Sequence, residues 1–254
     1  MNLGLEYIKY HWKAKRRHGV HSPFIYDLTD KCFRTPISPE LKSILNGLNS
    51  KLSKDSRSIE ISDFGAGSKK LSNVRTIRSI YNTSSSRGKF GTLLFQLVNH
   101  FKPKNVLEFG TSMGIGSICM ASGNSNSKIT TVEGCSNTFG IANENIAESQ
   151  LKNIESVNST FDNYLDGLTN EVFDLIFIDG HHDGEALTHY LKRLEPHSHN
   201  ETIFILDDIR WSESMFEAWE TIQSDERYHV TIDLFRMGMI VPRKEQEKEH
   251  FVIR

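Results

Sequence analysis

The sequence predicts an α/β protein with a parallel sheet that is covered by helices on both faces. From Asn105 onward, short apolar runs alternate with helix-like stretches, which is the pattern of strand–helix–strand units. The runs are short and largely apolar, as expected for strands that are covered on both faces. The first run leads into a glycine-rich turn, Gly110–Gly116, that opens a helix. We therefore expect ligands to bind beyond the carboxyl ends of the strands.

The elements follow in order along the chain. Apolar runs predict strands at 106–109, 129–132, 154–157, 173–178 and 203–206, with further candidates at 228–234 and 237–241. Helix-like stretches lie at 115–122, 136–150, 161–168, 183–194 and 212–224. Residues 1–100 are rich in Ser, Lys, Arg and Asn and show little strand character. We therefore expect an N-terminal helical extension over 1–100 and the sheet domain over 101–254.

The extension carries several hypotheses. Its larger apolar side chains provide a surface that docks on the sheet domain; they are Trp12, Phe24, Ile25, Tyr26, Leu28 and Phe33. The basic segment Lys13–Arg17 is either a solvated helix face or a contact for an anionic substrate or partner. Ser50–Ser58 is the best linker candidate. Arg75–Phe90 is either a plain connection or a lid over a substrate pocket, and its cations would then favour an anionic substrate.

Composition argues against several classes of protein. The chain has 254 residues and a formal net charge of −2, so no global charge favours nucleic acid or a membrane. The cysteines, Cys32, Cys119 and Cys135, lack metal-ligand spacing and are expected to be reduced thiols of a cytoplasmic protein. The N-terminus has no long apolar segment, so we expect neither a signal peptide nor a transmembrane helix.

The turn after the first predicted strand has the pattern of a nucleoside-binding site. Its glycines allow close approach of a ligand, although they would also serve a tight turn without one. Glu133 ends the next apolar run, where a Rossmann-like fold binds ribose hydroxyls, and it favours the ligand. Glu108 would repel a pyrophosphate and suits a cationic group, such as the amino group of a methionyl moiety. A similar stretch, Ile61–Ser68, lacks this context and is predicted to be a loop.

Acidic residues and histidines follow two later strands. Asp179, His181 and His182 come after 173–178, and Asp207 and Asp208 come after 203–206. Because neighbouring parallel strands end at the same edge of a sheet, these carboxylates could converge beside the nucleoside crevice. Three carboxylates suit a hard divalent cation such as Mg²⁺, which would lower the pKa of a bound hydroxyl while a histidine takes its proton. The alternative is that acids here cap the following helices: Asp208 before Ile209, or Asp183 near the start of the next helix.

The stretch from Val106 to about Ala218 resembles class I S-adenosylmethionine-dependent methyltransferases, in particular the branch of catechol and caffeoyl-CoA O-methyltransferases and their bacterial relatives. The turn Glu108–Gly114 is similar to the first motif of that family, and Glu133 to its ribose-binding acid. Phe177–His182 is similar to the fourth-strand motif, and Asp207–Asp208 to the metal positions of the metal-dependent members.

The resemblance implies a Rossmann-like, seven-stranded, mostly parallel sheet with an antiparallel last strand, and an S-adenosylmethionine-binding domain over 101–254. It implies that the cofactor is held by Glu108, Gly110, Thr111, Ser112, Gly114, Glu133, Ser159, Phe161 and Asp179, with Glu133 on the ribose and the Ser159–Phe161 segment near the adenine. It makes Asp179, Asp207 and Asp208 the metal positions. Catechol-type enzymes carry a lysine shortly after the fourth-strand acid, whereas this chain has His182. We therefore expect His182, with Asp179, to be catalytic.

These expectations combine into O-methylation of a small-molecule hydroxyl with S-adenosylmethionine, with or without help from a divalent cation such as Mg²⁺. A homodimer is the assembly that related small-molecule enzymes often form. One alternative is an RNA or protein methyltransferase, but only the N-terminal segment is basic. Another is a non-catalytic module that keeps the nucleoside site.

Overall fold

A computed structural model describes residues 2–15, 22–62, 74–83 and 86–254 of the chain. The chain groups into two compact units. We call Lys31–Gly167 the central unit, and Met1–Asp30 together with Leu168–Arg254 the terminal unit. The expected boundary at residue 100 stays a prediction. Each unit holds a different part of the predicted strand–helix pattern.

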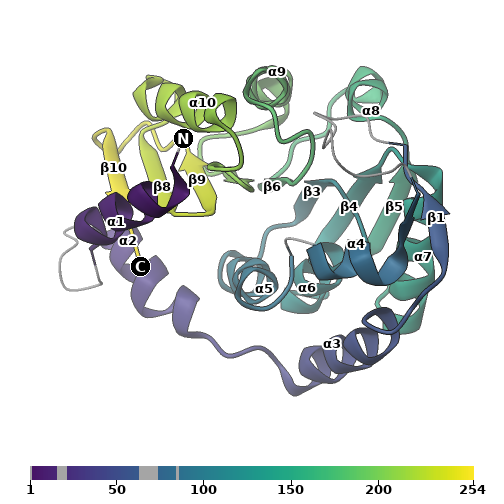
Figure 1. The fold of residues 1–254 in the computed structure, drawn as a ribbon. Helices are drawn as coiled ribbons and strands as arrows, with labels where there is room; N and C mark the ends of the chain where they lie inside the picture. The colour runs from purple at the N-terminus through teal and green to yellow at the C-terminus, as the bar shows by residue number, and fades with distance from the viewer. Residues whose placement is uncertain (1, 16–21, 63–73, 84–85) are drawn as a thin grey trace. The chain divides into compact units, whose positions relative to one another are not determined.

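The central unit contains the first three predicted strands and their helices (Figure 1). Strands β3 (Asn105–Phe109), β4 (Lys128–Glu133) and β5 (Ile154–Asn158) are parallel, with β4 in the middle. Helices α6 (Ile115–Gly123), α7 (Ser136–Ser149) and α8 (Phe161–Gly167) follow these strands in turn and pack on β4. Phe109 pairs with Val132, and Glu133 with Asn158, so the three carboxyl ends lie at one edge.

The remainder of the central unit is mostly helical. It comprises η2 (Cys32–Arg34), α3 (Pro39–Leu52), the antiparallel pair β1 (Ser58–Glu60) and β2 (Val74–Thr76), α4 (Ile77–Thr83) and α5 (Lys89–Phe101). Helix α3 begins at a Ser38 cap and buries Leu41, Leu48 and Leu52 at helical spacing, so it extends into the expected linker 50–58. Figure 1 shows α5 beside α6. The glycine motif of the expected loop 61–68 lies outside the described residues.

The described part of the expected lid Arg75–Phe90 is β2, α4, the turn at 86–88 and the start of α5. The guanidinium carbon of Arg87 lies 4.1 Å from the centre of the Tyr81 ring, and its Nη1 donates to Asn82 Oδ1 at 3.1 Å. Arg87 is therefore held against α4. The lid itself stays a prediction.

The terminal unit holds the remaining strands in the order β10-β8-β9-β7-β6. These are β6 (Leu175–Ile178), β7 (Ile203–Leu206), β8 (Val230–Leu234), β9 (Met237–Val241) and β10 (Glu249–Val252). Strand β9 is antiparallel to both of its neighbours, as expected for the last of the seven predicted strands. Strand β10 was not predicted. Its first two residues, Glu249 and His250, are polar and exposed, and of its four residues only Phe251 is buried.

Helices α1 (Leu3–Lys13), α2 (Pro23–Asp30), α9 (Gly184–Leu194), η3 (Glu195–His197) and α10 (Glu213–Ser224) complete the terminal unit. Figure 1 shows α9 beside α10. The expected docking residues Ile25 and Leu28 are fully buried, but Trp12 is 86% exposed, because α1 turns Tyr10 inward instead. Across the described residues, none of the helices is both long enough and apolar enough to span a membrane.

Candidate functional site

The predicted cofactor turn joins β3 to α6 and has an unusual backbone. Gly110, Ser112 and Gly114 have φ angles of 99°, 50° and 78°. Glycine adopts this left-handed region readily, whereas Ser112 does so at a cost, and such strain is often found at ligand sites. The Gly110 N–H donates to Val132 O at 3.0 Å, and the Gly114 N–H donates to Thr111 O at 2.8 Å. The turn is therefore tight and firmly attached to β4.

Glu133 fastens the same turn from the end of β4. One oxygen of its carboxylate accepts the Ser112 N–H at 3.0 Å, and the other accepts the Cys135 N–H at 2.9 Å. Burial raises the pKa of Glu133, and these backbone donors act in the opposite direction. The structure thus brings the expected ribose acid directly against the glycine turn.

Glu108 lies beneath the turn and is 1% exposed. Its Oε2 accepts a hydrogen bond from the Ser117 hydroxyl of α6 and another, at 2.7 Å, from the Thr131 hydroxyl of β4. Burial raises the pKa of Glu108 to about 7, although both hydroxyl donors lower it. The sequence indicated only a ligand contact for this carboxyl. The structure shows that it also joins β3, β4 and α6.

Close backbone approach explains Gly116, the third glycine of the motif. A Cβ atom there would lie 2.3 Å from Glu108 Oε1 and 3.0 Å from Ser86 Oγ. The side chain of Glu108 therefore occupies the space that a larger residue at position 116 would need. The glycine motif serves the buried carboxyl as well as the turn.

The expected adenine neighbours follow β5. The ring of Phe161 stacks on Phe109 with centroids 4.5 Å apart and an interplanar angle of 3°, and Phe161 is buried. The Ser159 N–H donates to Glu133 O at 3.1 Å. The central unit therefore assembles every predicted cofactor residue except Asp179, which belongs to the terminal unit.

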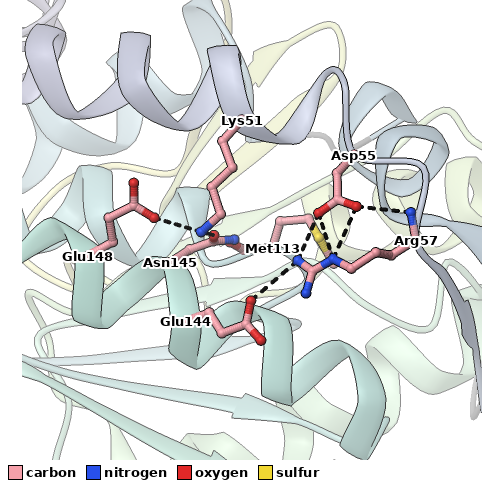
Figure 2. A network of polar contacts seen from close by, with 7 residues as sticks. All are labelled: Lys51, Asp55, Arg57, Met113, Glu144, Asn145 and Glu148. Atoms are coloured by element: carbon pink, nitrogen blue, oxygen red, sulfur yellow. Dashed lines mark hydrogen bonds and ion pairs between the residues drawn. The ribbon is translucent and has the colours of Figure 1, made fainter.

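A network missed by the sequence analysis supports the turn from α7 (Figure 2). Asn145 is fully buried and donates from Nδ2 to Met113 O at 3.0 Å. Lys51 of α3 donates to Asn145 Oδ1 at 3.2 Å and to Glu148 at 2.6 Å.

A second set of ion pairs is also drawn in Figure 2. Arg57 forms one ion pair with Asp55 and another with Glu144 of α7. The signal for this network was a polar residue, Asn145, on the buried stripe of an amphipathic helix.

In the terminal unit, the predicted acids meet an arginine. The carboxylates of Asp207 and Asp208 follow β7, and Asp207 is buried. The Arg236 guanidinium comes from the turn between β8 and β9, and its Nε lies 2.8 Å from Asp208 Oδ1 and 3.4 Å from Asp207 Oδ1. Its Nη2 donates to Asp207 Oδ2 at 3.4 Å. Arg236 was not singled out from the sequence, because a residue in a hairpin turn reaches strand ends only once the strands are paired.

Electrostatics tie these groups together. Burial raises the pKa of Asp208, and the negative charge of the neighbouring Asp207 raises this pKa further. The positive charges of Arg236 and His182 act in the opposite direction and lower the pKa. Burial alone would lower the pKa of Arg236, but the charges of Asp207 and Asp208 outweigh it and raise the pKa, with a smaller contribution from Asp179. The three acids expected to converge therefore act on one guanidinium.

His182 is the histidine that faces this cluster. Its Nδ1 lies 3.9 Å from Asp208 Oδ2, within reach of an ion pair but too far for a hydrogen bond. Its ring centre lies 5.5 Å from that of Trp211. His181 has a φ of 50° and forms a hydrogen bond through Nδ1 with the Tyr190 hydroxyl instead.

Of the two acids expected as alternative helix caps, Asp183 serves as one and Asp208 does not. Asp183 caps α9 by accepting the N–H groups of Glu185 and Ala186 at 3.0 and 3.1 Å. Helix α10 is capped by Ser212, which accepts the N–H of Met215. Asp208 itself has a φ of 50° and its side chain pairs with Arg236. It therefore does not serve as the cap of α10.

The residues present do not fit a divalent cation in this arrangement. Three carboxylates are chemically suitable for Mg²⁺, which needs oxygen ligands at about 2.0–2.1 Å. However, oxygens of Asp207 and Asp208 already face the guanidinium of Arg236. Within residues 2–15, 22–62, 74–83 and 86–254, no group of three or more His, Cys, Asp or Glu side chains is placed to hold a metal ion.

Comparison with known proteins agrees with the geometry of the turn. Residues 107–209 match the family model described as a methyltransferase domain. No curated protein matches the chain. Among solved structures, an SAH-bound methyltransferase from Podospora anserina is 16% identical, with 87% of this chain and 96% of that chain covered and a TM-score of 0.60.

Two further structures share the fold. An O-methyltransferase from Bacillus cereus in complex with SAH is 20% identical, covering 84% of this chain and 94% of that one at a TM-score of 0.56. A tomaymycin-synthesis O-methyltransferase from Streptomyces achromogenes in complex with SAM is 13% identical, covering 85% and 95% at a TM-score of 0.55. Residues 107–209 therefore resemble a methyltransferase domain, and the chain shares the Rossmann-like fold of these solved methyltransferases, O-methyltransferases among them.

Proposed function

We propose that the protein transfers the methyl group of S-adenosylmethionine to a hydroxyl of a small molecule. The observation that carries this proposal is the contact between the strained turn Gly110–Gly114 and the Glu133 carboxylate. This carboxylate accepts the Ser112 N–H of the turn at 3.0 Å. A carboxylate at this strand end suits ribose hydroxyls, which are hydrogen-bond donors. The relatives solved with SAM or SAH support the same cofactor here.

When bound, S-adenosylmethionine would supply a methyl group on a positively charged sulfonium, and transfer of that group to the acceptor oxygen would leave the carbon–sulfur bonding pair on sulfur. The protein contributes mainly by positioning, since orienting two reactants supplies several kcal/mol of the barrier. In this proposal the turn and Glu133 hold the nucleoside end, and Ser159 and Phe161, which follow β5, contact the adenine side.

His182 is the proposed base. The acceptor hydroxyl loses its proton as its oxygen attacks, and the Nε2 of His182 takes that proton. Asp208, 3.9 Å from Nδ1, favours the resulting imidazolium and orients the ring against Trp211. A positioned base of this kind contributes about 10²–10⁴-fold to the rate.

Calorimetry and a methylation assay test the proposal. Titration with S-adenosylmethionine and with its demethylated product should both give saturable heats, and NAD should give none. Incubation with S-adenosylmethionine and a panel of small phenols, catechols and anionic hydroxyl compounds should yield methylated products by mass spectrometry. Binding of NAD in place of the methyl donor would overturn the proposal, and salt-sensitive methylation of RNA alone would move the acceptor to the alternative class.

A further inference from the structure

Arg236 is a cation that the chain itself delivers to the acidic strand ends. Strand β8 is antiparallel to β9, and β9 to β7, so the β8–β9 turn lies at the carboxyl edge of β7. Leu234 pairs with Met237, which leaves Phe235 and Arg236 as the turn residues. Phe235 has a φ of 70°, and the Arg236 carbonyl accepts the Ile209 N–H at 2.9 Å. Both ends of Arg236 are therefore fixed beside Asp207 and Asp208.

The burial of the cluster favours a cation beside the ionised carboxylates. The side chain of Asp207 is fully buried, that of Asp208 is 13% exposed and that of Arg236 is 30% exposed. An ionised carboxylate is costly to bury without a cationic partner or metal. The guanidinium of Arg236 provides that partner for both carboxylates, whose nearest contacts with it are 2.8 Å for Asp208 and 3.4 Å for Asp207.

We propose that Arg236 takes the place of a divalent cation at the acidic strand ends, so that methyl transfer by this protein needs no metal. This inference rests on the proposed function above. Arg236 is a positioning residue: its guanidinium holds Asp208, and Asp208 in turn orients His182. A metal ion ligated by the same oxygens would bring a double positive charge against the guanidinium, which opposes binding strongly at such distances.

Metal binding provides a test that does not depend on activity. Mn²⁺, measured by the loss of its free electron paramagnetic resonance signal, should bind the wild-type protein only weakly. Arg236→Gln removes the cation but keeps a side chain of similar length, and it should bind Mn²⁺ at least about tenfold more tightly, because the repulsion is gone. Arg236→Lys keeps the charge and should show no gain.

The control is Arg227→Gln, which removes a more exposed arginine of the same unit that pairs with Asp225 and Glu195. It should leave Mn²⁺ binding unchanged. Adding Asp208→Asn to Arg236→Gln should abolish the new affinity. The inference would be overturned if the wild-type protein bound Mn²⁺ tightly and stoichiometrically and if Asp208→Asn lost this binding. This measurement does not depend on the folding of any arginine variant. A folded Arg236→Gln variant with no gain would overturn it as well.

Calorimetry with S-adenosylmethionine on the same wild-type preparation separates the two proposals. A normal heat of binding together with tight Mn²⁺ binding would refute only the role of Arg236. Absence of a heat would refute the proposed function, whatever the Mn²⁺ result.

Discussion

Replacing Glu108 by Gln should stabilise the protein without its cofactor at neutral and alkaline pH. Glu108 is 1% exposed, and its contacts are the Ser117 and Thr131 hydroxyls. A hydroxyl satisfies a carboxylate only in part, so burial dominates and raises the pKa of Glu108 to about 7. Glutamine has the same shape, can accept the same hydrogen bonds through its carbonyl oxygen, and never has to ionise.

The sign and size follow from linkage. Because the folded-state pKa of about 7 lies above the ordinary value of 4.5, the carboxyl destabilises the fold as pH rises. The protonated Glu108 carboxyl contributes its full share of the free energy of unfolding below about pH 4.5, and this contribution is lost as the pH rises through about 7. The difference between the two pKa values corresponds to about 3 kcal/mol. Between about pH 4.5 and pH 7, the free energy of unfolding of the wild-type protein should therefore fall by up to about 3 kcal/mol relative to that of Glu108→Gln.

Urea unfolding of both proteins at pH 5, 6, 7 and 8 measures this difference. All other groups are common to the two proteins, so only the difference between their unfolding free energies matters. Glu155→Gln serves as a control, since that carboxylate is 55% exposed and pairs with Lys128 at the surface. A difference between wild type and Glu108→Gln that stays constant from pH 5 to pH 8 would show that the buried carboxyl does not titrate as reasoned.

Three other perturbations test the site. Gly116→Ala places a Cβ 2.3 Å from Glu108 Oε1 and should lower the free energy of unfolding in urea by about 1–3 kcal/mol. The control is Gly140→Ala, where a Cβ meets nothing within 4 Å and stability should be unchanged or slightly raised. Equal effects of the two substitutions would refute the packing argument. Asn145→Ala leaves a buried carbonyl of the turn without its donor and should cost about 1–3 kcal/mol, with weaker S-adenosylmethionine binding by calorimetry. His182→Ala should slow methyl transfer about 10²–10⁴-fold while the dissociation constant of S-adenosylmethionine is unchanged; an unaffected rate would remove His182 as the base.

The local sequence pattern was sufficient for most of the elements. The seven predicted strands are present, and helices lie at 115–123, 136–149, 161–167, 184–194 and 213–224, close to the predicted ranges. Each of these elements is marked by its own apolar period or by a cap within a few residues, such as Asp183 before α9. Strand β10 begins with two exposed polar residues, Glu249 and His250, and was not predicted.

The sequence by itself determined the class of fold, the glycine turn and the acids at the strand ends, because strand–helix alternation and turn chemistry are local properties. The tertiary structure decided what those acids contact. Glu108 is covered by Ser117 and Thr131, and the two acids after β7 are paired with Arg236. Each partner lies on another strand, helix or turn and comes into reach only when the sheet and its helices are assembled. Charge and burial at a site are set by neighbours in space, which spacing along the chain does not specify.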